Sequence, residues 1–142
     1  MVYDQSVDRE FVLYKLIYEL DSGRLNLGVL LLEAGDTETS FADMLFRPDL
    51  EILLELDPNA DLEYLRLLEK DIRNMLRSRH REYIDSDHPI SRRDWILSRI
   101  LNDFSNLVRV LGPVAVSADA AEPPAAELLK QLRLYTGARS QA

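Results

Sequence analysis

The chain has 142 residues, of which 46% are hydrophobic, and this is enough to build the core of one domain spanning residues 1–142. It contains no cysteine, which excludes disulfides, thiolate zinc sites and cysteine nucleophiles. The N-terminus lacks the basic and then apolar pattern of a signal peptide, and apolar runs such as Val29–Leu32 are far short of a membrane span. We therefore expect a cytoplasmic protein that does not bind membranes.

The net charge of −8 is unevenly distributed along the chain. Residues 1–65 carry 4 basic and 15 acidic side chains, whereas residues 66–99 carry 9 basic and 6 acidic ones. This balance disfavours non-specific binding of nucleic acid, because the overall field repels phosphate. Contact between the basic region and a phosphate group or an acidic partner is left open.

The first half of the chain predicts an antiparallel meander. Phe11–Leu20 alternates in the manner of a strand, and residues 21–24 supply turn-forming side chains. Leu25–Glu33 is apolar on nearly both faces, which predicts a central strand paired with the first in a hairpin. Ser40–Arg47 is expected to be the third strand.

Two helices are expected after the meander. Pro48 favours a helix start, so residues 49–56 are predicted to form a short helix. The segment 62–84 has apolar residues at three- and four-residue spacing, which predicts an amphipathic helix. Either Asp57 or Asp61 is expected to cap it.

The last part of the chain adds a helix, a strand and a terminal helix. Ser91 begins a pattern that resembles a capping box, and the helix is expected to run through Phe104. Residues 107–116 predict a strand interrupted at Gly112–Pro113, where proline indicates an edge position or a bulge. Residues 127–135 predict a short terminal helix.

This order of elements is typical of an α+β fold. We expect an antiparallel sheet of three to four strands, made of the N-terminal meander and a later strand. The helices are expected to pack on one face of that sheet.

Basic residues form the most distinctive pattern in the sequence. Arg73, Arg77 and Arg81 are four residues apart and so lie on one helical face. Guanidinium groups in such a row can grip phosphates or carboxylates. Alternatively, they complement the dipole at the helix C-terminus and pair with the many acids, as exposed basic helix faces commonly do. The candidate contact residues for an anion or a partner are Arg73, Arg77, Arg79, Arg81, Arg92 and Arg93.

No residue is assigned a catalytic, cofactor-binding or metal-binding role. The two histidines, His80 and His88, have a spacing that matches no zinc motif. The sequence lacks a nucleophile elbow, a Walker motif and an HExxH motif. A hydrolase or nuclease that uses acidic residues with one of these histidines is left open, but a role without catalysis is favoured.

Asn26 and Gly28 are unusual residues for the interior of the second strand. One interpretation is a close approach of a ligand or a partner chain to the backbone at Gly28. The other is a bulge, or tight packing of a helix over the sheet.

The run from Phe11 to Glu33, with its charged turn and the sequence Asn26-Leu27-Gly28-Val29, resembles the opening of a bacterial family catalogued as domain of unknown function 3037. Phe46-Arg47 and residues 122–132 are also similar. The family has no established activity, and some relatives are encoded beside kinases of the toxin–antitoxin type. The resemblance therefore implies an accessory or interaction role.

We expect a non-enzymatic accessory or protein-interaction domain without cofactors, whose protein partner could be a second copy in a homodimer. Aromatic residues support this hypothesis, because some of them are expected to exceed what a small core needs: Tyr14, Tyr18, Phe41 and Trp95. The alternative is binding of nucleic acid or a phosphate ligand through the arginine-rich helix face.

Overall fold

The structure is a computed structural model that describes residues 9–34, 41–78, 92–104 and 108–137. The strands are β1 (Arg9–Leu20), β2 (Gly23–Glu33), β3 (Ala42–Phe46) and β4 (Val108–Ala118). The helices are the 3-10 turn η1 (Leu50–Ile52), α1 (Leu53–Leu56), α2 (Leu62–Ser78), α4 (Arg92–Phe104) and α5 (Pro124–Thr136).

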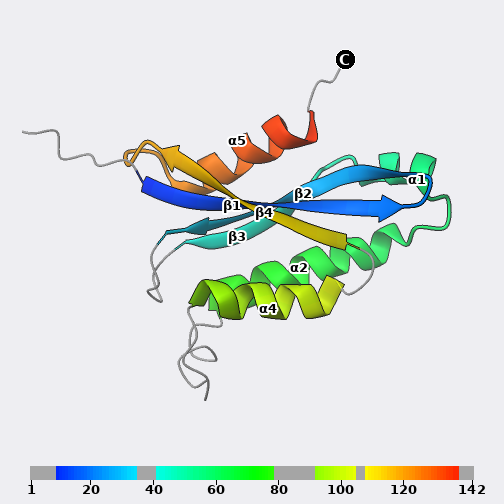
Figure 1. The fold of residues 1–142 in the computed structure, drawn as a ribbon, viewed down its shortest axis with the longest axis horizontal. Helices are drawn as coiled ribbons and strands as arrows, with labels where there is room; N and C mark the ends of the chain where they lie inside the picture. The colour runs from blue at the N-terminus through cyan, green and yellow to red at the C-terminus, as the bar shows by residue number, and fades with distance from the viewer. Residues whose placement is uncertain (1–8, 35–40, 79–91, 105–107, 138–142) are drawn as a thin grey trace, which may run out of the picture.

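The four strands form one antiparallel sheet in the order β3-β2-β1-β4 (Figure 1). The predicted meander is confirmed, since β1 pairs with β2 and β2 pairs with β3. The apolar second strand is central, as predicted, and β3 and β4 are the two edges. The α+β class is therefore confirmed, with one correction to the placement of the helices.

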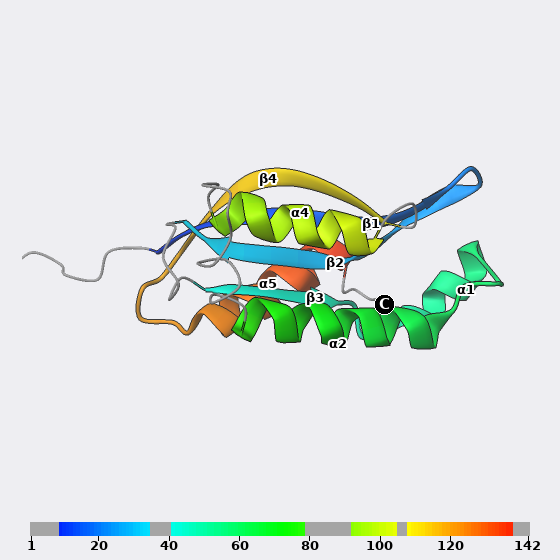
Figure 2. The ribbon, with the colours of Figure 1, turned by 90° about the horizontal axis from the view of Figure 1, so that it is seen from below.

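One face of the sheet is covered by α2 and α4, as predicted (Figures 1 and 2). On this face, Tyr14 and Leu16 of β1 belong to the same buried cluster as Ile72 of α2 and Ile100 of α4. The leucines and isoleucines at helical spacing form the apolar stripe of α2, and burying that stripe against the strands holds the two layers together.

The terminal helix α5 does not join the other helices, which corrects the prediction that the helices pack on one face. Its Leu128 and Leu132 pack with Phe11 and Val29 on the opposite face of the sheet. Lys15 also lies over the ring of Tyr135, 5.0 Å from its centroid. The physical reason is that β1 and β2 are apolar on both faces, so both faces need a cover.

The β4 strand has both features that its proline predicted. It lies at an edge, and its register with β1 shifts between Leu13 and Lys15, opposite Gly112–Pro113. An edge tolerates proline because the missing N–H is not needed on the outer side, and a bulge accommodates the extra residue.

The two candidate caps of α2 have different roles. Asp61 caps the helix, since its carboxylate accepts the N–H of Tyr64 at 3.0 Å. Asp57 instead accepts the hydroxyl of Tyr18 at 2.6 Å and the N–H of Asn59 at 3.1 Å. Ser91, the predicted cap of α4, lies outside the described residues.

The aromatic residues that were expected to exceed the needs of the core belong to it. Tyr14 and Tyr18 are only 6% and 5% exposed, and Trp95 is partly buried against the same cluster. Phe41 packs edge-to-face on Phe11 with ring centroids 6.3 Å apart. The packing of these four side chains therefore does not mark a partner surface by itself.

Candidate functional site

Two of the predicted arginines bind a buried carboxylate of the same chain. Arg73 donates from Nε and Nη2 to the two carboxylate oxygens of Asp43, at 3.0 Å each, and Arg77 donates to Oδ2 at 3.3 Å. Asp43 lies on β3 and is only 5% exposed. Its hydrogen bond to the guanidinium raises the pKa of Arg73 further. Much of this arginine face thus serves to fasten α2 to β3.

The structure does not describe the side chains of the remaining residues of the arginine prediction. Arg79 and Arg81 lie outside the described residues, as do His80 and His88. Arg92 and Arg93 are the first residues of α4. Of the six candidate arginines, the structure describes the side chains of Arg73 and Arg77, and these two it does bring together.

A small pocket of about 150 Å³ lies beside this ion cluster. It is lined by side chains of α2 on one helical stripe: Glu69, Lys70, Arg73, Asn74 and Arg77. The sequence pattern identified the two arginines of this stripe but not Lys70, which lies three residues before Arg73 on the same face of the helix.

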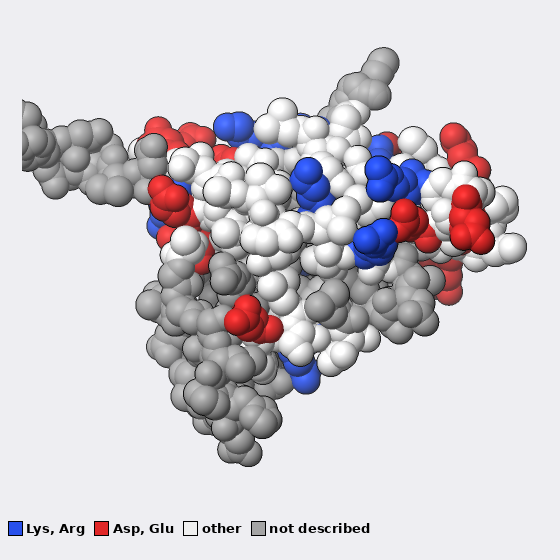
Figure 3. Space-filling model, in the orientation of Figure 1, with Lys and Arg blue, Asp and Glu red and all other residues white. Residues whose placement is uncertain are grey.

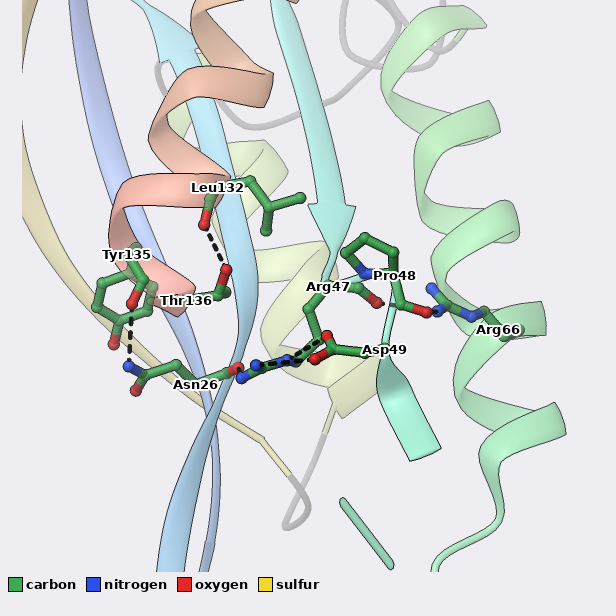
Figure 4. Close-up of polar contacts among 8 residues, drawn as sticks. All are labelled: Asn26, Arg47, Pro48, Asp49, Arg66, Leu132, Tyr135 and Thr136. Carbon is green, nitrogen blue, oxygen red and sulfur yellow. Dashed lines mark hydrogen bonds and ion pairs between the residues drawn. The ribbon is translucent and has the colours of Figure 1, made fainter. Parts of the chain in front are cut away.

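Asn26 joins two distant parts of the chain, as Figure 4 shows. Its amide Nδ2 donates to the carbonyl of Tyr135 at 3.1 Å, and its own carbonyl accepts Nη1 of Arg47 at 2.9 Å. Carbonyls in the last turn of a helix have no partner within the helix, so this amide satisfies one end of α5. Asn26 is thus explained by contacts within the chain.

Gly28 lies at a bulge of β2, where the pairing with β1 shifts by one residue. A Cβ at this position would collide with the backbone carbonyl of Leu45 and would lie 2.8 Å from the Cα of Phe46. The close approach inferred from the sequence therefore exists, but the neighbour is β3 of the same chain rather than a ligand or partner.

The end of β3 is held by two arginines that sequence reasoning missed (Figure 4). Arg47 is only 8% exposed and bonds Asp49 through Nε at 2.8 Å. Arg66 of α2 donates to the carbonyls of Arg47 and Pro48 at 2.9 and 2.8 Å. The apolar periodicity that predicts α2 gives no indication of which strand its polar side chains reach.

The outer edge of β3 is closed by side chains. Arg47 donates its N–H to Leu27 of β2, and residues 42, 44 and 46 alternate with it, so their N–H groups point outward. The N–H of Met44 is bonded by the carboxylate of Asp43 at 2.8 Å, and that of Phe46 by Glu69 at 2.7 Å. The N–H groups of Met44 and Phe46 therefore have acceptors without a second strand.

Within the residues that the structure describes, the outer edge of β4 is open. Residues Gly112 to Ala115 are exposed, and Val114 retains 42% of its accessible surface. Among the described residues, only β1 pairs with this strand. Its single charged side chain, Arg109, is bonded to Glu19 of β1 at 2.7 Å. Figure 3 shows this side of the molecule, with a broad, mostly uncharged area over β4.

A second pocket, of about 370 Å³, lies between the end of β4 and α5. Glu127 lines it and is 7% exposed, with its carboxylate bonded by the amide of Gln131 at 2.5 Å. An acid in the first turn of a helix complements the N–H groups there, which explains Glu127 without a ligand. Within the described ranges, no group of His, Cys, Asp and Glu side chains is arranged to hold a metal ion.

No helix in the described part of the chain is long and apolar enough to cross a membrane. Comparison of the chain with protein-family models, with curated proteins and with solved structures gives no match in any of the three. The resemblance to domain of unknown function 3037 therefore stays a prediction.

Proposed function

We propose that the protein is a non-enzymatic accessory domain that acts through protein–protein contact, as a homodimer joined by the β4 strands of two copies. The observation that carries this proposal is the open β4 edge. It is an 11-residue strand at the rim of the sheet, apolar in composition and exposed in its middle.

An open strand edge offers a row of backbone N–H and C=O groups, and the partner that matches this row is another extended strand. Proteins usually protect such an edge with charges or a cover. β4 carries one charged residue over its whole length, and Glu19 of the same sheet neutralises it. The β4 edge therefore has less protection against pairing with another strand than the edge of a typical monomeric protein.

Charge does not oppose a second copy at the β4 edge itself. The chain has a net charge of −8, so two copies repel each other over most of their surfaces. At β4 they would meet without opposing like charges, because neither strand presents an unpaired charge.

The strand also has a segment that can pair with itself. Gly112–Pro113 interrupts the edge, but Val114 to Ala118 has no proline and no charge. With Val116 on a two-fold axis, Val114 would face Ala118 of the copy. Both residues are on the same side of the sheet, since Val114 pairs with Leu13 and Ala118 with Arg9, four residues apart on β1. Because each copy uses the same edge, the assembly closes as a dimer and does not grow.

The test is the oligomeric state measured by light scattering over a range of concentrations. We expect wild type to be a dimer and the variant Val114→Lys to be a monomer. The lysine is solvated on the exposed strand of a monomer, but in the dimer it would be buried at the joint. Circular dichroism should show that the variant keeps its fold.

Leu67→Lys is the matched control. Leu67 is 55% exposed on α2, so the same kind of change is made on the face remote from β4, and we expect the dimer to persist. A wild-type protein that is strictly monomeric at high concentration contradicts the proposal, and so does a Val114→Lys variant that dimerises as wild type does.

The proposal includes a cytoplasmic location, which is supported by the absence of cysteine and of any helix in the described residues that could span a membrane. An accessory role also agrees with what the resemblance to domain of unknown function 3037 implies. Proteolysis of cell fractions followed by immunodetection would test the location.

A further inference from the structure

We propose that the pocket on α2 binds one phosphate-sized dianion, either free phosphate or the phosphate group of a larger molecule. This site is separate from the β4 edge and is independent of the proposed dimer. It rests on the arrangement of Lys70, Arg73 and Arg77 around the pocket of about 150 Å³.

The three cations lie on one stripe of α2. Arg73 follows Lys70 by three residues and Arg77 follows Arg73 by four, so their side chains project from neighbouring turns of the same face. Asn74 adds an amide to the lining of the pocket. Guanidinium and ammonium groups that converge in this way are the usual donors to phosphate oxygens.

Asp43 orients the two arginines, and Glu69 is occupied by other partners. Asp43 holds Arg73 through two hydrogen bonds and also contacts Arg77, so the guanidinium groups are positioned before a ligand arrives. Glu69 lines the pocket, but one of its oxygens accepts Arg66 and the other accepts the N–H of Phe46. Preorganised donors lose less entropy on binding.

The charges around the pocket favour a dianion. Among the residues that the structure describes here, four cations, those of Arg66, Lys70, Arg73 and Arg77, accompany the two carboxylates of Asp43 and Glu69, which leaves two positive charges in excess. This excess is local, since the chain as a whole is acidic. A singly charged carboxylate would leave one of the two charges uncompensated.

The size of the pocket suits a small ligand group. A volume of about 150 Å³ has room for one tetrahedral oxyanion. A larger phosphorylated molecule would place its phosphate group in the pocket and the rest of its structure outside.

Isothermal titration calorimetry with inorganic phosphate at low ionic strength tests the site, with phosphoserine as the ester probe. We expect saturable binding at one site per chain. Lys70→Ala and Arg77→Ala should each weaken it by about tenfold or more, because each removes a charge-assisted hydrogen bond. Both side chains are exposed, so these variants should fold, whereas loss of Arg73 would leave Asp43 buried with a weaker partner.

Arg133→Ala is the control, since it removes the same charge from α5 on the opposite side of the sheet and should leave the affinity for phosphate unchanged. Phosphoserine that binds while free phosphate does not would assign the site to phosphate esters. The monomeric variant Val114→Lys should bind phosphate as wild type does, which separates the two proposals.

Absence of saturable binding of either probe at low salt would overturn the inference. An equal loss of affinity in Arg133→Ala would also overturn it, because only the overall charge would then matter. Binding of RNA without binding of either probe would point to an extended basic surface in place of this pocket.

Discussion

The two edges of the sheet end in opposite ways. At β3, Glu69 and Asp43 bond the outward N–H groups of Phe46 and Met44, and Arg66 bonds the carbonyl that follows the strand. At β4, the only side-chain bond in the described part of the strand is from Arg109 to its neighbour Glu19. One edge is closed by polar side chains of α2 and β3, whereas no other described strand pairs with the other edge, which is why we propose it as the dimer interface.

In this protein, the side chains of the adjacent helix determine whether the backbone groups of an edge strand are hydrogen-bonded or left exposed. α2 lies along β3 and its acidic and basic side chains reach the strand. α4 lies beneath β4, where Val108 and Val110 join the core cluster of Ile96 and Ile100. An apolar contact of that kind leaves the backbone edge free.

The largest effect is expected from Gly28→Ala, which would break the closed edge. The new Cβ meets the backbone of Leu45 and Phe46, so β3 must move away from β2. We expect a loss of about 3 kcal/mol or more in the free energy of unfolding, measured by urea denaturation. Gly137→Ala is the control: its Cβ would have no atom within 4 Å, so only its left-handed φ of 65° would cost stability, about 1 kcal/mol. Equal losses in the two variants would contradict the steric explanation.

The next largest effect is expected from Arg73→Ala. Asp43 would remain buried with the Met44 N–H at 2.8 Å and Arg77 at 3.3 Å, and loss of the cation that donates to both of its carboxylate oxygens should cost roughly 3 kcal/mol. Arg77→Ala should cost less than about 1 kcal/mol, because that side chain is 55% exposed and makes a single contact. Chemical denaturation of both variants measures the difference. If Arg77 proved to be the costlier loss, Asp43 would depend on a different partner from the one described.

A smaller effect is expected from Glu69→Ala, which removes the acceptor of the outward N–H of Phe46. The unfolding free energy should fall by about 1–2 kcal/mol. Hydrogen exchange at the Phe46 amide should become faster by NMR, as that group would then face solvent. Asp71→Ala, an exposed change on the same helix, should stay within about 0.5 kcal/mol of wild type. An unchanged exchange rate at Phe46 would mean that the β3 edge is closed by something else.

The smallest effect is expected from Tyr18→Phe, which breaks a contact between β1 and the segment that follows α1. Tyr18 bonds Asp57, and burial together with that bond raises the pKa of its phenol from 10.0 to about 12. The folded state therefore holds the proton more tightly than the unfolded state, so this contribution is complete below pH 10 and is lost as the pH rises toward about 12. Tyr18→Phe should be less stable by about 1 kcal/mol at neutral pH, and the difference from wild type should shrink in that alkaline range.

Denaturation of wild type and Tyr18→Phe at increasing pH measures this effect. Tyr64→Phe is the control, because that phenol is 43% exposed on α2. A difference between wild type and Tyr18→Phe that stays constant through the alkaline range would show that the hydrogen bond does not set the titration.

Most of the elements could be predicted from the sequence because their signals are local. Alternation along residues 11–33 and the leucine spacing of α2 depend on neighbours within a few positions. The proline in β4 indicated its edge position and its bulge for the same reason. The side of the sheet on which α5 packs could not be predicted, because a short amphipathic helix fits either apolar face of β1 and β2.

The candidate site was less predictable than the fold. The sequence singled out Arg73 and Arg77, but their partner Asp43 is 30 and 34 positions away, and nothing local links them. Asn26 and Gly28 stood out as unusual residues, but the sequence did not show which residues contact them. Tyr135, for example, is 109 positions from Asn26. An unusual residue in a strand indicates that its position is structurally constrained, but it does not identify the contacting residue that causes the constraint.

The amino-acid sequence by itself therefore determined the strands, the principal helix, the α+β class and the concentration of positive charge along α2. Only the tertiary structure decided which edge of the sheet is closed, which face receives α5 and which carboxylate holds the arginines. The reason is physical. Secondary structure follows from periodic burial over a few residues, whereas hydrogen bonds and ion pairs depend on atoms that come within about 3 Å only after distant segments have packed.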